Sequence, residues 1–109
     1  MKKIYSGVRV YPDQGKLSEV NVTVGGKRLF HHERHSPDGF NWGYGGSGPA
    51  DLALSILWDY LGKEPTIEMC AKFKNECVAK WEDIWNISSD EIELCILDIE
   101  VETDLRKER

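Results

Sequence analysis

The clearest pattern of hydrophobic and polar positions is an apolar stretch that runs from Pro49 to Leu61. Polar side chains interrupt this stretch at every fourth position, as Asp51, Ser55 and Asp59. This spacing places them in one narrow strip along a helix, while the rest of the helix surface is almost entirely apolar. A helix of this kind is typical of a domain core. The pattern therefore predicts a central helix over residues 49–61, ended by the glycine and the proline that follow at positions 62 and 65.

Two stretches near the N-terminus alternate between apolar and polar residues, as half-buried strands do. The first covers residues 3–10 and the second runs from Val20 to Val24. Gly25-Gly26 follows the second stretch and suits the two-residue turn of a hairpin, so residues 27–30 are expected to return as a partner strand. Proline, aspartate and glycine predict a turn at residues 12–15. The N-terminal third therefore predicts a small antiparallel sheet.

Helical spacing returns after Thr66, which is placed to cap a second helix. One face of this helix, predicted over residues 67–81, carries the side chains of Met69, Cys70, Phe73, Cys77 and Trp81. Residues 85–88 are expected to form a connector, and the Ser88-x-x-Glu91 spacing of a capping box predicts a third helix. Residues 97–102 alternate again, which leaves helix and strand both open for them.

Together these elements predict a single α+β domain, in which a small antiparallel β-sheet with an N-terminal hairpin packs on about three α-helices. Its expected parts are an N-terminal sheet over 3–30, a loop rich in glycine and aromatic residues over 35–48, a helical part over 49–103 and a frayed, charged tail over 104–109. Residues 40–42 within the loop are expected to form a short strand. The length of 109 residues suits one hydrophobic core.

The balance of charge limits the expected partners. The chain has 19 acidic residues against 14 lysines and arginines, a formal net charge of −5. Direct binding to nucleic acid is not expected, because that needs a basic face. No apolar run reaches the roughly 18–20 residues that cross a membrane. The Met-Lys-Lys start also lacks the apolar region of a secretory signal, so we expect a cytoplasmic protein without a membrane partner.

The three cysteines, Cys70, Cys77 and Cys95, are odd in number and show no CxxC spacing. On a helix over 67–81, Cys70 and Cys77 would lie two turns apart, which is too far for a disulfide. We expect reduced, buried thiols that pack as small apolar side chains. A redox or metal role is the alternative interpretation.

The glycines between residues 43 and 48 are the sharpest candidate for a binding site, and they occupy positions 43, 45, 46 and 48. Backbone N–H groups at a helix start, together with Ser47, can hold a phosphate or carboxylate. Trp42 and Tyr44 can stack on a base or a sugar. The alternative is a structural turn that leads into the core helix. Asp51, expected in the first turn of that helix, would repel an anion and so favours the structural interpretation.

Other candidate chemistry is weaker. His31, His32 and His35 have no carboxylate or cysteine at a familiar metal-ligand spacing, so no metal or other cofactor is expected. His35, next to Ser36 and near the glycines, is the best of the three for contacting a ligand. A Ser47, His35 and Asp51 triad lacks the GxSxG elbow, so the sequence favours a protein that is not an enzyme.

The run from His35 to Ala50 (HSPDGFNWGYGGSGPA), continued by Leu52-Ala53-Leu54, resembles a family of short bacterial proteins. Members of that family also occur in phages and plasmids, and the family is catalogued only as a domain of unknown function. Its other landmarks resemble Tyr5-x-Gly7, a Val-x-Val strand followed by glycine, Phe73-Lys74 and Trp85-x-Ile87-Ser88. The family commonly has glutamine where this chain has Asp51. The resemblance covers the chain to about Ile92.

The resemblance implies a protein of a mobile element acting in the bacterial host cell, in counter-defence or host takeover. It also favours a functional rather than a purely structural loop. The leading hypothesis is a small non-enzymatic ligand-binding protein that sequesters a phosphate-containing nucleotide signal. Its expected ligand-binding residues are His35, Ser36, Trp42, Tyr44, Gly45, Gly46, Ser47 and Gly48.

The alternative hypothesis is an acidic inhibitor that binds a host protein, either a defence complex or a nucleic-acid-binding complex, much as anti-CRISPR proteins do. Its surface would be an acidic strip and tail, formed by Asp90, Glu91, Glu93, Asp98, Glu100 and Glu102. The two hypotheses differ in whether the loop or the exposed carboxylates are essential. The sequence leaves the oligomeric state open.

Overall fold

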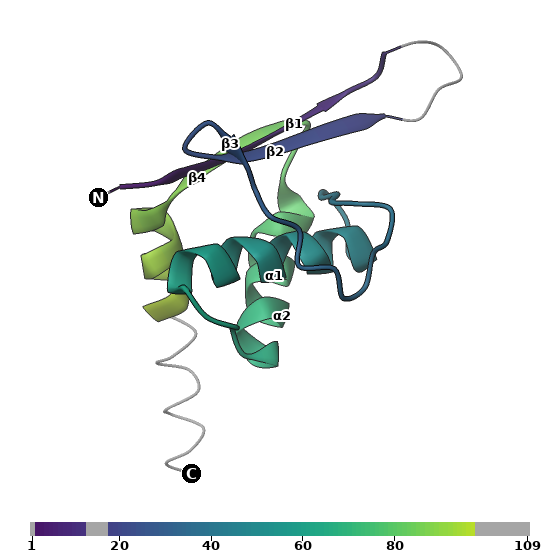
Figure 1. Ribbon diagram of the computed structural model, residues 1–109. Helices are drawn as coiled ribbons and strands as arrows, with labels where there is room; N and C mark the ends of the chain where they lie inside the picture. Colours follow the sequence, from purple (N-terminus) through teal and green to yellow (C-terminus); the bar gives the residue numbers. More distant parts are fainter. Residues whose placement is uncertain (1, 13–17, 98–109) are drawn as a thin grey trace.

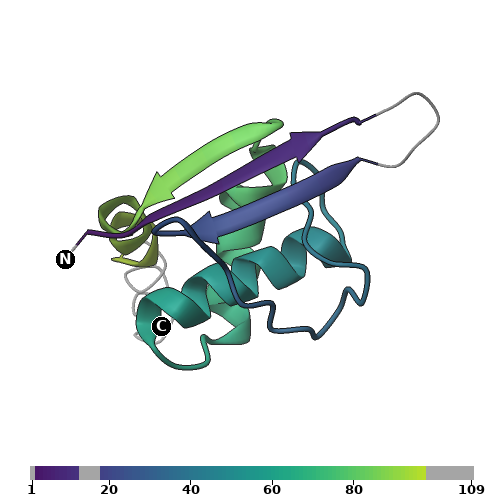
Figure 2. The same ribbon diagram turned by 45° about the horizontal axis from the view of Figure 1, so that its top comes forward.

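The computed structural model describes residues 2–12 and 18–97. Within this part, a four-stranded antiparallel sheet lies on three α-helices, so the predicted α+β class is confirmed. The sheet forms one layer, and the helices pack against one of its faces (Figure 1). The turned view shows the longest helix running beneath the sheet (Figure 2).

The predicted hairpin is present at the N-terminal end. Strand β1 (Ile4–Val10) pairs antiparallel with β2 (Glu19–Val24), and β2 pairs with the two-residue strand β3 (Lys27–Arg28). Gly25 and Gly26 form the β2–β3 turn with φ of 57° and 82°, values that L side chains rarely adopt. The return strand is shorter than the predicted 27–30, because only two residues pair with β2.

The connector predicted at residues 85–88 is wrong, because these residues belong to a strand. Strand β4 (Ile84–Ser88) pairs antiparallel with β1 and completes the order β3-β2-β1-β4. Trp85 lies directly opposite Gly7, and a Cβ at position 7 would come within 2.3 Å of the indole. A glycine in β1 therefore makes room for the tryptophan of β4.

The helices agree with the capping signals in the sequence. Helix α1 (Ser47–Leu61) begins two residues earlier than predicted and ends at Gly62, whose φ is 72°. Helix α2 (Ile67–Glu76) is capped by Thr66, whose Oγ1 accepts a hydrogen bond from the N–H of Met69. It stops before the predicted residue 81, and a short 3₁₀ helix, η1 (Val78–Lys80), follows.

A third helix includes residues 89–97. The predicted capping box is complete, since the Glu91 carboxylate accepts from the N–H and Oγ–H of Ser88, and the Glu91 N–H donates back to Ser88 Oγ. The start of this helix also continues the edge of the sheet, because the Ser89 N–H donates to the Lys3 carbonyl. The third helix is thereby held against the first residues of the chain.

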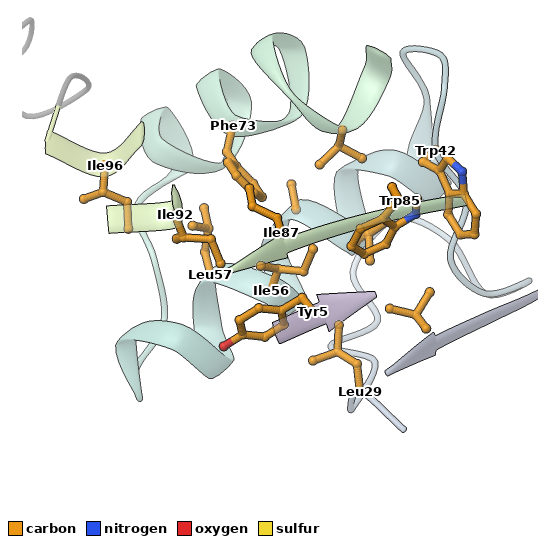
Figure 3. Packing of buried hydrophobic residues seen from close by; sticks show 14 residues of the cluster. Tyr5, Leu29, Trp42, Ile56, Leu57, Phe73, Trp85, Ile87, Ile92 and Ile96 are labelled. Atoms are coloured by element: carbon orange, nitrogen blue, oxygen red, sulfur yellow. The ribbon is translucent and has the colours of Figure 1, made fainter. Parts of the chain in front are cut away.

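The core lies between the sheet and the helices (Figure 3). Leu52, Ile56 and Leu57 of α1 are fully buried and meet Tyr5 of β1 and Phe73 of α2. Every residue from Asp51 to Leu57 is buried. Helix α1 is thus the central helix that its apolar surface predicts.

Three other expectations have different outcomes. Residues 40–42 are not a strand, since their polar groups bond to the side chains of Arg9 and Asn41 rather than to a sheet. The turn at 12–15 lies largely outside the described residues, as do the alternating stretch at 98–102 and the tail at 104–109. Among the helices of the described part, none has the length and apolar character needed to cross a membrane.

We predict that Leu57→Ala lowers the free energy of unfolding by about 2–5 kcal/mol, because it removes a fully buried side chain and leaves a cavity. That loss is a large fraction of the roughly 5–15 kcal/mol that stabilises a typical domain. Urea unfolding followed by tryptophan fluorescence measures it. Leu94→Ala, at an exposed position of the third helix, is the control. Equal losses for the two variants would contradict the assigned core.

Candidate functional site

The polar strip of α1 attaches other parts of the chain to the helix. Asp59 accepts a hydrogen bond of 2.6 Å from the hydroxyl of Tyr5 in β1, and a second of 3.3 Å from Lys3. One turn earlier, Ser55 Oγ accepts from the backbone N–H of His32 at 2.9 Å. The four-residue spacing seen in the sequence is therefore a row of attachment points along one side of a helix that is otherwise apolar.

Asp51 makes the largest set of these contacts. Its buried carboxylate accepts backbone hydrogen bonds from His35 and Ser36 at 2.9 Å, and from Arg34 at 3.2 and 3.3 Å. The His31 ring completes the set through a contact of 2.9 Å between Nε2 and Oδ2. We call residues 31–36 the latched segment, because one side chain of α1 binds four of its six residues.

The surroundings of Asp51 determine its charge state. Burial alone would raise the pKa of Asp51, but the hydrogen bonds from His31 and from the three backbone N–H groups outweigh burial and hold the pKa below its ordinary value of 3.8. Asp51 is therefore ionised at neutral pH, and its charge is used in holding the latched segment.

This geometry corrects the expected role of Asp51. Because α1 begins at Ser47, Asp51 lies in the second turn, and the first turn holds no acidic residue. The carboxylate faces the latched segment, where four donors balance it. The expected first-turn position of Asp51 is therefore wrong, and the carboxylate interacts with the latched segment instead.

A cavity of about 240 Å³ opens between the latched segment, α1 and α2. Its lining combines four aliphatic side chains from both helices with two cations, an imidazole and a thiol. The lining residues are Ala50, Leu54, Ile67 and Ala71, together with Arg34, His35, Cys70 and Lys74. Such a combination of apolar lining and a few polar groups is typical of small-molecule sites.

The charged groups around the cavity remain accessible. The Arg34 guanidinium is 42% exposed and lies 2.5 Å from a carboxylate oxygen of Glu64, an exposed pair that contributes little to stability. Lys74 is half-buried on α2. Burial raises the pKa of the Cys70 thiol, so at neutral pH it is protonated and unsuited to nucleophilic attack.

Of the eight predicted ligand-binding residues, the structure places only His35 at this cavity. Ser36 is buried behind it, and its hydroxyl donates to the Gly39 carbonyl at 2.8 Å. The backbone N–H of Ser36 donates to the Asp51 carboxylate. Ser36 therefore positions the latched segment rather than facing the cavity.

Trp42 lies in the core. It is fully buried, its Nε1–H donates to the Glu82 carbonyl at 2.6 Å, and it meets the edge of Trp85 (Figure 3). The guanidinium of Arg9 sits 4.7 Å from the centre of a Trp42 ring and donates to the Trp42 carbonyl. In this arrangement the indole anchors the loop, and it has no exposed surface on which a base can stack.

The glycines of the loop divide into two kinds. Gly43 has φ of 87°, and a Cβ there would lie 2.9 Å from the Trp81 carbonyl. A Cβ at Gly48 would lie 2.8 Å from Asn41. These two positions require glycine for packing, whereas Gly45 has open space around it and a backbone that any residue can adopt.

The exposed part of the loop is separate from the cavity. Tyr44, Gly45 and Ser47 are exposed, and Tyr44 packs beside Gly46, the N-cap of α1. Gly46 makes no side-chain cap, so the helix start keeps open N–H groups. The predicted role of this part of the loop in holding an anion stays a prediction.

The three histidines have different partners. His31 binds Asp51 and packs on Phe40, whereas His32 stacks on Trp58 with ring centres 3.8 Å apart. His35 lies at the cavity. In the described ranges, no group of three or more histidine, cysteine or acidic side chains could hold a metal ion.

Sequence reasoning misses two features of this region. No local pattern singles out Arg34 and Lys74, because they come from a loop and a helix that only the fold brings together. Nor does any spacing link Cys77 to Cys95, yet their sulfurs lie 3.8 Å apart, both as free thiols. Burial, and then the Cys95 thiol, raise the pKa of Cys77 to about 12.

We predict that Asp51→Asn lowers the free energy of unfolding at neutral pH by about 1.5–3 kcal/mol, because an amide cannot replace a charged acceptor of several N–H groups. The Asp51 contribution is complete above the ordinary carboxyl pKa of 3.8 and is lost as the pH falls through the lower pKa of the folded state. The stability difference between wild type and variant should therefore shrink in acid. Urea unfolding from neutral pH down to about pH 2.5 measures it.

Asp38→Asn, which changes an exposed carboxylate outside the latched segment, is the control for this measurement. It should follow the wild type at every pH. A difference between Asp51→Asn and wild type that stays constant into acid would show that the Asp51 charge does not stabilise the fold.

One comparison with known proteins identifies a family. A family of unknown function, DUF6166, matches residues 3–98, which includes every strand and helix described above. Neither the curated proteins nor the solved structures gave a match. The match covers most of the chain, and the protein belongs to the DUF6166 family.

Proposed function

We propose that this protein is a non-enzymatic binder of a small anionic molecule, with a phosphate-bearing nucleotide as the first class to test. The observation that supports the proposal is the cavity beside the latched segment, where Arg34 and Lys74 line the same space as four aliphatic side chains. The cations would bind a phosphate, and the aliphatic side chains would contact an uncharged ring. Guanidinium and ammonium groups are the usual phosphate partners in proteins.

The size of the cavity limits the ligand. A volume of about 240 Å³ lies below the roughly 300–1,000 Å³ of sites that enclose drug-sized molecules. A mononucleotide or a smaller phosphate ester therefore suits the site better than a dinucleotide. Leu54 and Ile67 would pack on the faces of a base, as aliphatic side chains commonly do.

Binding rather than catalysis is favoured by the state of the reactive groups. Cys70 is held as a thiol by burial, and the Asp51 carboxylate already has four hydrogen-bond donors. Neither group is therefore available as a nucleophile or general base. His35 would serve as a polar contact. The proposed biological use, sequestration of a nucleotide signal in antagonism of host defence, is supported only by the resemblance to mobile-element proteins.

The test is calorimetric titration of AMP, GMP, cyclic nucleotides, adenosine and inorganic phosphate into the wild type and into Arg34→Gln and Lys74→Gln. Removing one charged hydrogen-bond donor costs about 1.5–3 kcal/mol, which corresponds to an affinity loss of about 10-fold to 150-fold. Adenosine should bind more weakly than AMP, because it lacks the phosphate. Lys80→Gln, an exposed change on η1 outside the cavity, should bind like the wild type.

Ser47→Ala separates the cavity from the glycine loop. Loss of affinity in Ser47→Ala with normal binding by Arg34→Gln and Lys74→Gln would move the site to the start of α1. If no compound binds the wild type, the nucleotide hypothesis fails and the acidic inhibitor of a host protein becomes the hypothesis to pursue.

A further inference from the structure

The sheet has one covered and one open face. All helices of the described residues lie on one side, and the views in Figures 1 and 2 place none of them on the other side. Alternation along the strands defines the open face, which we call the outer sheet face. Its residues are Ile4, Ser6, Val8 and Val10 of β1, Glu19, Asn21 and Thr23 of β2, Arg28 of β3, and Ile84 and Asn86 of β4.

The centre of the outer sheet face is apolar. Val8 and Ile84 are paired neighbours on adjacent strands, and they are 37% and 72% exposed. Ile4 and Val10 extend the apolar row along β1, at 42% and 47% exposed. Four β-branched side chains exposed together on a regular sheet favour a surface that another sheet covers.

Two opposite charges lie on either side of Val8 along this face. Glu19 pairs with Val10 at one end of β1, and Arg28 pairs with Thr23, which itself pairs with Ser6. Val10 and Ser6 are each two residues from Val8. Measured along the strands, Glu19 and Arg28 therefore lie at the same distance from Val8, in opposite directions. Neither side chain has an ion-pair partner among the residues that the structure describes.

We propose that this protein forms a symmetric dimer in which the outer sheet face packs against the same face of a second copy. A twofold axis along the row of Asn21, Val8 and Ile84 makes the strands of the two sheets antiparallel. It places Val8 against Val8, and it brings Glu19 of each copy to the same level along the strands as Arg28 of the other copy, one strand farther across the sheet. Facing sheets lie about 10 Å apart, a gap that a glutamate and an arginine span together.

This charge arrangement favours a second copy over an unrelated partner. An acid and a base that lie at equal distances on the two sides of the axis, measured along the strands, are brought to the same level by the twofold rotation, as an isologous interface requires. The dimer would contain two Glu19–Arg28 pairs and an apolar centre formed by Val8 and Ile84 of both copies. The cavity between the latched segment, α1 and α2 lies on the helical side and stays open in this dimer, so the inference is independent of the proposed function.

Charge reversal tests the arrangement. Glu19→Arg and Arg28→Glu should each raise the Kd of the dimer by about tenfold or more, because both pairs in the dimer become repulsive. A mixture of the two variants should recover the dimer, since each charge introduced in one variant then faces the opposite charge introduced in the other. The two unchanged side chains, Arg28 of the first variant and Glu19 of the second, also face each other. Analytical ultracentrifugation over a dilution series measures Kd, and native mass spectrometry identifies the mixed dimer by its mass.

Lys27→Glu is the matched control, because it makes the same change of charge one residue away and on the other face of β3. It should dimerise like the wild type, and circular dichroism should show that every variant is folded. A wild type that is monomeric at all concentrations would overturn the proposal. So would a wild-type dimer whose Kd is unchanged by both reversals, since the interface would then lie elsewhere.

Discussion

Removing a carboxylate from water is costly unless hydrogen bonds replace its hydration, and Asp51 is fully buried in the side of the central helix. The replacing donors are the His31 ring and three consecutive backbone N–H groups, all from the latched segment. Opening the segment would leave a charge without partners and expose several unpaired donors. The buried Asp51 carboxylate and the latched segment therefore stabilise each other in their folded positions. Their contact fixes the path of the chain from β3 to α1.

The arrangement of the rest of the molecule follows from this constraint. The latched segment places Arg34 and His35 beside α2 and so creates the cavity with its charged rim. Farther along the chain, Trp42 is anchored by Arg9 and by the Glu82 carbonyl, so the loop is fixed immediately before its glycines. A long block of glycine and aromatic residues is thus accounted for largely by packing. The described structure requires glycine at positions 43 and 48, and it leaves Tyr44, Gly45 and Ser47 between them exposed.

Most of the fold could be predicted because its signals are local. A glycine pair, two helix caps and an apolar stretch with one polar strip each act within a few residues, and all are confirmed. Strand β4 could not be predicted in this way, because residues 84–88 become a strand by pairing with β1 at the other end of the chain. The site was less predictable. His35 was found from its neighbours, but Arg34 and Lys74 meet only through the fold, and the burial of Trp42 depends on Arg9 and Trp85.

Amide hydrogen exchange of the latched segment, followed by NMR, tests the role of Asp51 most directly. In the wild type, the N–H groups of Arg34, His35 and Ser36 should be protected, although they lie outside any helix or strand. Asp51→Asn should remove protection at these three amides and leave the amide of Leu57, in the middle of α1, protected. Exchange of the three wild-type amides at the rate of an unstructured peptide would contradict the account, because the segment would then not be held by the carboxylate.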